Sequence, residues 1–174
     1  MTAPSFTIRR ATPGDAPAIA GIWLEGLAQN LVRVERTLGA GEAEAAFADR
    51  LVLAAPPFGF WVAAGTDGAL LGWQSILACV NNPLLRERCA EASTYVLPLA
   101  SHAGVGEALL RHAMKEATGA RFNHLLGWII NPRALRMVER CGWTQVGLLP
   151  ETERVRESER WHLVAWAVPQ ASEP

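Results

Sequence analysis

The chain has 174 residues, of which 50% are hydrophobic and 19% are charged. This length and composition suit one globular domain with a core of its own and exclude wholesale disorder. Sixteen Lys and Arg against seventeen Asp and Glu leave a net charge of -1, so the long-range field that concentrates nucleic acid or anionic lipid is missing. No apolar run approaches the roughly 20 residues that span a bilayer, and the N-terminal stretch lacks the apolar region of a signal peptide. We therefore expect a cytoplasmic protein that binds neither nucleic acid nor membrane.

The cysteines and histidines show no spacing that is typical of a redox motif or a metal site. We expect Cys79, Cys89 and Cys141 to be buried, reduced thiols. Because the four histidines also lack a ligand pattern such as H-E-x-x-H, we predict that the protein holds no metal.

Hydrophobic periodicity and glycine or proline breaks divide the chain into strands and helices. In chain order they predict a strand at 5–10, a helix that opens at Thr12 and Pro13, a helix at 41–55, strands at 60–64 and 69–78 joined as a hairpin, a strand at 89–96, a helix at 104–118, a strand at 122–130, a short helix between Asn131 and Gly142, and strands at 143–148 and 161–168. The nearly all-apolar strand at 122–130 is of the kind that is buried on both faces. We predict one α/β domain over residues 1–174, with a core of about 5–168, a tail at 169–174, and helices on both faces of a mixed sheet.

A glycine-containing turn opens the helix at 104–118. Gly104 and Gly106 flank Val105 where the first amides have no acceptor within the helix and the helix dipole is positive, so a phosphate fits there. A dinucleotide fingerprint would need Gly or Ala at the position of Leu109, and a Walker loop would need Lys and Ser or Thr after the last glycine. Neither pattern is present, and what remains is a strand, a short loop, G-x-G and a helix.

With the β-α-α order at the start of the chain, this unit resembles the GNAT family of acyl-CoA-dependent N-acetyltransferases, in which a Gln/Arg-x-x-Gly-x-Gly/Ala loop holds the coenzyme A pyrophosphate. The resemblance is closest to the phosphinothricin and methionine sulfoximine N-acetyltransferase branch. The motifs of that branch are matched by Ala90, Glu91, Ser93, Tyr95 and Val96 of an A-E-S-x-Y-V-like strand, by Asn131, Leu135, Glu139, Gly142 and Trp143 of N-x-x-S-x-x-L-x-E-x-x-G-[FY], and by Trp161 and His162 of a late G-x-W-x-D strand. The resemblance runs from Thr7 to Val168 and implies a GNAT fold, with a mixed, mostly antiparallel sheet of about seven strands.

The resemblance implies that the protein transfers an acetyl group from acetyl-CoA to the primary amine of a small molecule, an amino acid or analogue, by direct attack. Glu91 then matches the carboxylate that acts as general base, commonly through water; otherwise it is a solvated residue on a polar strand face. Tyr95 would protonate the departing thiolate, because Val138 occupies the position of the family's Tyr or His; otherwise Tyr95 is a packed strand aromatic.

The resemblance also assigns the cosubstrate site. The backbone amides of Val96 and Leu97 would bond the thioester oxygen, and the side chain of Asn131 would bind the pantetheine arm, act as a helix N-cap, or do both. The diphosphate loop would consist of Ser101, His102, Ala103, Gly104, Val105 and Gly106. Ser101 replaces the family's Gln or Arg, and the loss of one charge-assisted hydrogen bond would weaken coenzyme A binding about tenfold. His102 would compensate in part, or is a solvated loop residue.

The acceptor side is less well defined. Trp73, together with Trp61 and Trp161, would line the acceptor pocket, and Arg86 or Arg88 would pair with a substrate carboxylate. The alternatives are core packing for the tryptophans and solvent-facing turn positions for the arginines. A homodimer is implied by the family alone. Two other functions stay open: a non-catalytic or degenerate acyl-CoA-binding relative, and a protein N-terminal or lysine acetyltransferase.

Overall fold

The structure is a computed structural model that describes residues 5–29, 39–79, 88–150 and 160–170. Its strands are β1 (Phe6–Arg10), β2 (Gly59–Gly65), β3 (Leu70–Ala78), β4 (Cys89–Val96), β5 (His124–Ile129), β6 (Thr144–Leu148) and β7 (His162–Ala167). Its helices are α1 (Ala16–Gln29), α2 (Ala40–Leu53), α4 (Val105–Thr118) and α5 (Pro132–Arg140), with 3-10 turns η1 (Pro13–Asp15) and η2 (Pro98–Ala100). Every predicted element is present, with ends that differ by a few residues. None of the helices described has the length and apolarity needed to cross a membrane.

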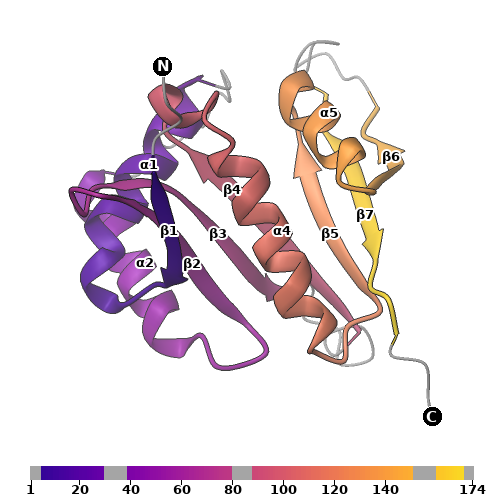
Figure 1. Ribbon diagram of the computed structural model, residues 1–174, viewed down its shortest axis with the longest axis horizontal. Helices are drawn as coiled ribbons and strands as arrows, with labels where there is room; N and C mark the ends of the chain where they lie inside the picture. The colour runs from indigo at the N-terminus through magenta and orange to yellow at the C-terminus, as the bar shows by residue number, and fades with distance from the viewer. Residues whose placement is uncertain (1–4, 30–38, 80–87, 151–159, 171–174) are drawn as a thin grey trace.

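The strands form one seven-stranded sheet in the order β1-β2-β3-β4-β5-β7-β6. All neighbouring strands pair antiparallel except β4 and β5, which are parallel. The helices α4 and α5 lie over one face of the sheet, whereas α1 and α2 pack on the other face of its first half (Figure 1). This arrangement confirms the mixed, mostly antiparallel sheet with helices on both faces.

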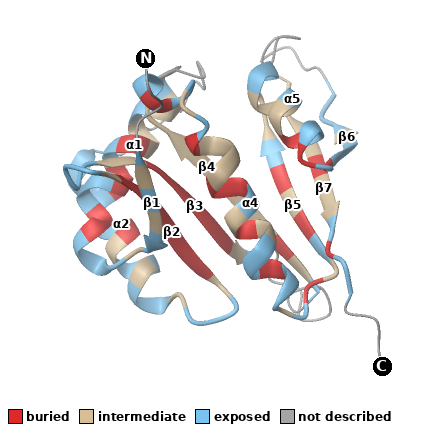
Figure 2. Ribbon diagram, in the orientation of Figure 1, coloured by how far each residue is buried: buried red, intermediate tan, exposed pale blue. Residues whose placement is uncertain are grey.

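One face of α4 is packed against the middle of the sheet. Its inward side chains recur every four residues, which matches the period of a helix, and each is fully buried: Val105, Leu109, Ala113 and Ala117. They lie over β2, β3 and β4, and the first two of these strands are buried along most of their length (Figure 2). This packing fixes the place of the turn at the N-terminus of α4 relative to β4.

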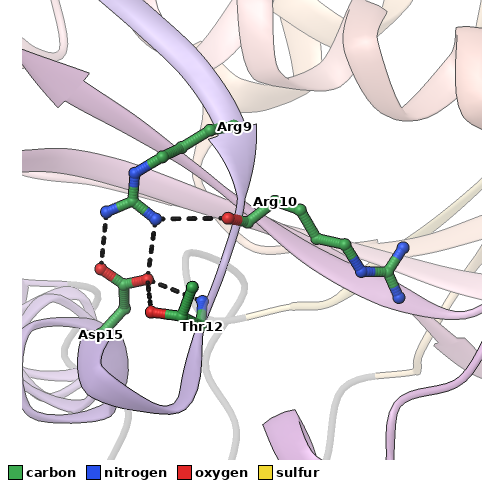
Figure 3. A network of polar contacts seen from close by, with 4 residues as sticks. All are labelled: Arg9, Arg10, Thr12 and Asp15. Atoms are coloured by element: carbon green, nitrogen blue, oxygen red, sulfur yellow. Dashed lines mark hydrogen bonds and ion pairs between the residues drawn. The ribbon is translucent and has the colours of Figure 1, made fainter.

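The Asp15 carboxylate links the end of β1 to the start of α1 through hydrogen bonds. The Arg9 guanidinium donates two hydrogen bonds of 2.8 Å to Asp15, whose Oδ2 also accepts from the Thr12 amide at 2.7 Å and from the Thr12 hydroxyl at 2.9 Å (Figure 3). The bond from Arg9 holds the pKa of Asp15 well below its usual range, against the opposing effect of burial, and Thr12 acts in the same direction as Arg9. Thr12 is confirmed as an N-cap, although the first turn is 3-10 rather than α-helical.

Burial differs from the sequence expectation in two places. The apolar stretch 122–130 predicts burial on both faces, but β5 is exposed at His124 and at Trp128, which is 44% exposed. Among the described elements, α1 and α2 do not extend over this part of the sheet, so one face of β5 is open. All three cysteines are free, but only Cys141 is buried, whereas Cys79 and Cys89 are partly exposed.

Candidate active site

The central feature of the sheet is the place where β4 and β5 part. Their parallel pairing begins at Cys89 and ends at Glu91, which lies opposite Leu126. Both strands continue beyond this point, to Val96 and Ile129, and diverge (Figure 1). The last part of β4 therefore has no partner on its β5 side among the described strands, and Glu91 lies at the vertex of the opening.

Neighbouring side chains on β4 point to opposite faces of the sheet. Tyr95 faces α1, because its ring stacks on Trp73 with centroids 4.8 Å apart and a Cβ on Gly26 would lie 2.7 Å from it. Val96 faces α4, because a Cβ on Gly106 would lie 3.4 Å from its Cγ2. Strand residues at even spacing from Tyr95 share its face. The opening is therefore bordered by α1 on one face of the sheet and by the N-terminus of α4 on the other.

A cleft of about 400 Å³ opens on the Tyr95 face of the parted strands. One wall comes from β4, and the other comes from β5 and from residues next to β6 and β7. The lining side chains are Glu91, Ser93, Tyr95, Trp128, Leu149 and Trp161. The structure thus brings together the two predicted catalytic residues and one of the three tryptophans considered for the acceptor pocket.

Glu91 is placed in the cleft as a partly buried carboxyl group. Burial raises its pKa above the usual value, while a hydrogen bond from Ser93 and the positive charge of Arg50 act in the opposite direction. The bond is a long one, since the Ser93 hydroxyl donates to Oε1 of Glu91 at 3.5 Å. A carboxylate whose pKa moves towards the working pH is a better proton acceptor, so the environment of Glu91 suits a general base.

Tyr95 is held in place from the core side of the sheet. Burial raises the pKa of its hydroxyl; a hydrogen bond with Trp23 opposes this rise, and the charge of Glu91 adds to it. The phenol therefore stays protonated and is a proton donor rather than a base. Trp73, which is 3% exposed, stacks on Tyr95 and donates from Nε1 to the Ile19 carbonyl at 3.1 Å. Contrary to expectation, Trp73 does not line the cleft; it supports Tyr95 from behind.

The register of β3 against β4 decides which backbone amide faces the opening. Leu97 donates its amide to the Leu71 carbonyl at 2.9 Å, so this amide is not available to a thioester, contrary to expectation. In an antiparallel ladder successive residues direct their N–H groups to alternate sides. Val96, which pairs with Gly72, therefore directs its amide away from β3 and into the opening. Of the two predicted amides, only that of Val96 is placed to meet a ligand between the strands.

The turn before α4 has room for an anion next to its glycines. Gly104 is the N-cap of α4 with φ of 78°, a left-handed conformation that favours glycine, and an added Cβ would meet nothing within 4 Å. The amides of the following first turn have no acceptor within the helix. Ser101 is engaged locally, because its hydroxyl and its amide both donate to the Pro98 carbonyl, at 2.7 and 3.2 Å. His102 is exposed. Within the loop predicted to bind the diphosphate, the features that suit an anion thus lie at Gly104, Val105 and Gly106.

This arrangement, with two parallel strands that part beside the N-terminus of a helix, agrees with the comparison with protein families. Residues 27–143 match the model of the acetyltransferase (GNAT) family. The chain belongs to the GNAT family of acetyltransferases. The matched range contains β4, the glycine turn, α4 and β5, so it includes both sides of the opening. The resemblance seen in the sequence motifs is confirmed.

Many solved structures share the fold of this GNAT acetyltransferase. The phosphinothricin acetyltransferase from Sinorhizobium meliloti, solved in complex with acetyl-CoA, has a TM-score of 0.80 at 20% identity over 96% of this chain and 90% of that chain. The yncA protein from Salmonella typhimurium, solved with its cofactor acetyl-CoA, has a TM-score of 0.80 at 21% identity over 98% of each chain. The ribosomal-protein-alanine N-acetyltransferase from Brucella melitensis has a TM-score of 0.75 at 22% identity over 92% of this chain and 99% of that chain.

The TM-scores establish a shared fold, but at these sequence identities they do not define the acceptor. The names of the relatives include a small-molecule acetyltransferase and a protein acetyltransferase at similar distances from this chain. A fold supports many functions, so the acceptor has to be argued from the site. In sequence, no curated protein matches the chain.

Two other predicted contacts of this GNAT acetyltransferase, Asn131 and Arg88, are not among the described residues that line the cleft. Asn131 is the N-cap of α5, where its Oδ1 accepts from the Arg133 amide at 2.9 Å, which confirms the capping alternative. Arg88 is exposed and is not among the described residues that line the cleft, and its carbonyl accepts from the Asn123 amide at 2.7 Å. Arg86 lies outside the described residues. No group of three or more His, Cys, Asp or Glu in the described part of the chain is placed to hold a metal ion.

Sequence reasoning gave no site role to three cleft residues, Ser93, Trp128 and Leu149. A signal for Trp128 was available, because the two-residue period that buries Leu125 places Trp128 on the other face of β5. Leu149 follows β6, and its amide donates to the Trp161 carbonyl at 2.9 Å. That contact joins segments far apart in the sequence and left no local signal.

Proposed function

We propose that this protein transfers the acetyl group of acetyl-CoA to the primary amine of a small molecule by direct attack, with Glu91 as the general base. The observation that carries the proposal is the position of Glu91 at the vertex of the β4–β5 opening, in one cleft with Tyr95. Acetyl-CoA supplies an acetyl group activated as a thioester. Similar structures from Salmonella typhimurium and Sinorhizobium meliloti hold this ligand.

The residues around the opening fit such a ligand. The backbone at Gly104, Val105 and Gly106 would hold the diphosphate, since the glycines let it approach and the first-turn amides donate to it. The Val96 amide, directed into the opening, would bond the thioester oxygen as negative charge develops on it. Asn131 keeps its side-chain NH2 group for the pantetheine arm, because its Oδ1 is the atom used in capping α5.

Glu91 would take the proton from the amine. A primary amine with a pKa of about 10 is protonated at neutral pH and has no lone pair for attack. Once Glu91 or a water bound to it accepts that proton, a nitrogen–carbon bond forms to the acetyl group as the carbon–sulfur bond breaks. Tyr95 has a protonated phenol in the same cleft and would return a proton to the leaving sulfur. The nitrogen loses a second proton as it becomes an amide nitrogen, which replaces the proton that Tyr95 gave. The products are therefore the N-acetylated amine, coenzyme A thiol and one proton that Glu91 releases to solvent.

The test is thiol release from acetyl-CoA with a panel of amines, for the wild type, Glu91→Gln and Tyr95→Phe. We expect Glu91→Gln to lower kcat at least about 100-fold, which is the usual contribution of a general base. Tyr95→Phe is expected to cost less, because a thiolate of pKa about 8.5 can leave unaided. Glu44→Gln, an exposed position on α2, is the matched control.

Two results would contradict the proposal in different ways. Absence of thiol release with every amine would reject the transferase function for small amines. Full activity of Glu91→Gln would reject the role of Glu91 and leave the transfer reaction standing. The acetyl-CoA-induced rise in melting temperature, measured for each variant, separates loss of chemistry from loss of the cosubstrate site.

A further inference from the structure

The acceptor side of the cleft has an unusual balance of charge and apolar surface. The six described residues that line it contribute one carboxyl group, one hydroxymethyl group, one leucine and the aromatic rings of Tyr95, Trp128 and Trp161. None of the described residues that line it is Lys or Arg. The described lining therefore offers an anion and apolar walls but no cation, and Arg50, whose positive charge acts on Glu91, is not among the described lining residues.

This balance disfavours an amine that carries a carboxylate close to its nitrogen. In an α-amino acid the carboxylate is two bonds from the amine nitrogen, so the nitrogen cannot approach Glu91 without bringing the carboxylate near it. Both charges would lie in a partly buried cleft, where screening by salt is weaker than at an open surface. Repulsion between Glu91 and the substrate carboxylate therefore disfavours the amino-acid acceptor that the family resemblance implies.

The aromatic walls favour an apolar body on the acceptor. Trp128, on β5, is 44% exposed although it belongs to a strand of the central sheet. It stands on the opposite side of the opening from Tyr95 of β4, and Trp161 extends the same wall. Large aromatic surfaces gain most from burying apolar or aromatic groups, and their faces also attract a cationic ammonium before it loses its proton.

We propose, building on the acetyl transfer proposed above, that the acceptor is a primary amine with an aromatic or other apolar body and no neighbouring carboxylate, selected by Trp128 and Trp161. An arylalkylamine is the simplest compound of this class. Its ammonium group lies towards Glu91, and its ring lies between the β4 and β5 walls. In the reaction the ammonium nitrogen becomes an amide nitrogen and loses two protons: one leaves through Glu91 to solvent, and the other ends on the coenzyme A thiol.

The test compares amines that differ only in the carboxylate. Thiol release is measured with phenethylamine against phenylalanine and with tryptamine against tryptophan, and phenylalanine amide restores the bulk of the carboxylate without its charge. We expect kcat/KM to be at least tenfold higher for each amine than for its amino acid, with phenylalanine amide close to phenethylamine. Equal or better activity with the amino acids would overturn the inference and leave the proposed transfer reaction intact. That result would point to Arg160, whose Nε donates to the Leu149 carbonyl at 3.1 Å, as the partner of the carboxylate.

A binding measurement keeps the two proposals separable if no amine is acetylated. Quenching of tryptophan fluorescence is titrated with phenethylamine and with phenylalanine in the presence of coenzyme A. Tighter binding of the amine supports the acceptor class even where turnover fails, and equal or weaker binding of the amine rejects it.

Variants of Trp128 test whether the aromatic wall binds the acceptor. Trp128→Ala is expected to raise KM for phenethylamine about tenfold, with a smaller change in kcat, and Trp128→Phe is expected to restore most of the affinity. Because Trp128 is 44% exposed, its loss leaves the core intact. Val146→Ala on β6, at a position 57% exposed and outside the cleft lining, is the control and should leave KM unchanged. An unchanged KM in Trp128→Ala would reject the role of this wall.

Discussion

Gly106→Ala tests the diphosphate turn with little risk to the fold. A Cβ at this position would lie 3.4 Å from Cγ2 of Val96 and 3.5 Å from Sδ of Met137, both ordinary contact distances. Alanine in place of a helical glycine gains about 0.5 to 1 kcal/mol. We therefore expect the variant without ligand to melt at the same temperature as the wild type or slightly higher. The same Cβ would lie between Val96 of β4 and Met137 of α5, on the side of the turn where we propose that the ligand passes.

The size of the effect follows from the bond that the methyl group would displace. A backbone hydrogen bond to a charged phosphate is worth roughly 1.5 to 3 kcal/mol, so its loss weakens acetyl-CoA at least about tenfold. At a ligand concentration of 100 times the wild-type Kd, binding stabilises the wild type by about 2.7 kcal/mol and a tenfold weaker variant by about 1.4 kcal/mol. For a chain of this size 1 kcal/mol corresponds to about 2 to 4 °C, so the ligand-induced shift should fall from about 5–11 °C to about 3–6 °C.

Thermal melting with and without acetyl-CoA is the assay, and Gly21→Ala is the matched control. Gly21 is an exposed residue of α1, and a Cβ there would meet nothing within 4 Å. This control should show the same helical gain and keep the full ligand-induced shift. If Gly106→Ala also keeps the full shift, the diphosphate does not lie against this turn and the placement argued above is refuted.

Three further variants test the fold and its charges. Asp15→Asn should lower the unfolding free energy by about 2 kcal/mol at pH 7. Because the folded state holds the pKa of Asp15 below its usual 3.8, that difference should shrink as the pH falls below 4, and urea denaturation showing a constant difference down to pH 2 would contradict this account. Glu91→Gln should melt at a higher temperature than the wild type at pH 8, because burial penalises the Glu91 carboxylate above its raised pKa. The gain in melting temperature should vanish below pH 4.5, where Glu91 is protonated in both the folded and the unfolded state. A gain that persists at pH 4 would argue against burial as its cause. Gly72→Ala should lose about 1 to 3 kcal/mol by denaturant titration, because its Cβ would lie 2.7 Å from the Tyr95 carbonyl oxygen, and wild-type stability would show that the backbone yields there.

The strands and helices were predictable because their signals are local. Alternation of apolar and polar residues gives β4 its observed bounds, and Pro98 and Gly104 mark the breaks on either side of the following loop. The glycine turn that opens α4 was equally predictable, since it depends only on Gly104 and Gly106 at the start of a helix.

The less predictable features depend on partners distant in the sequence. The choice of the Val96 amide over that of Leu97 is set by the register against β3, which a single strand does not reveal. The exposure of Trp128 depends on which part of the sheet α1 and α2 cover. The residue pattern of an apolar strand does not reveal whether a helix covers it. Trp73 was expected in the acceptor pocket because tryptophan serves core and cleft alike, and the tertiary structure places it in the core.

β4 and β5 part between α1 on one face of the sheet and the N-terminus of α4 on the other, so the proposed enzyme would receive its two substrates from opposite faces. The thioester would arrive past the N-terminus of α4, and the amine would arrive from the opposite face, where Tyr95 lies. Neither molecule has to leave before the other enters. Initial-rate plots at several fixed concentrations of either one should therefore give intersecting lines, the pattern of a reaction in which both substrates are bound together when the acetyl group moves.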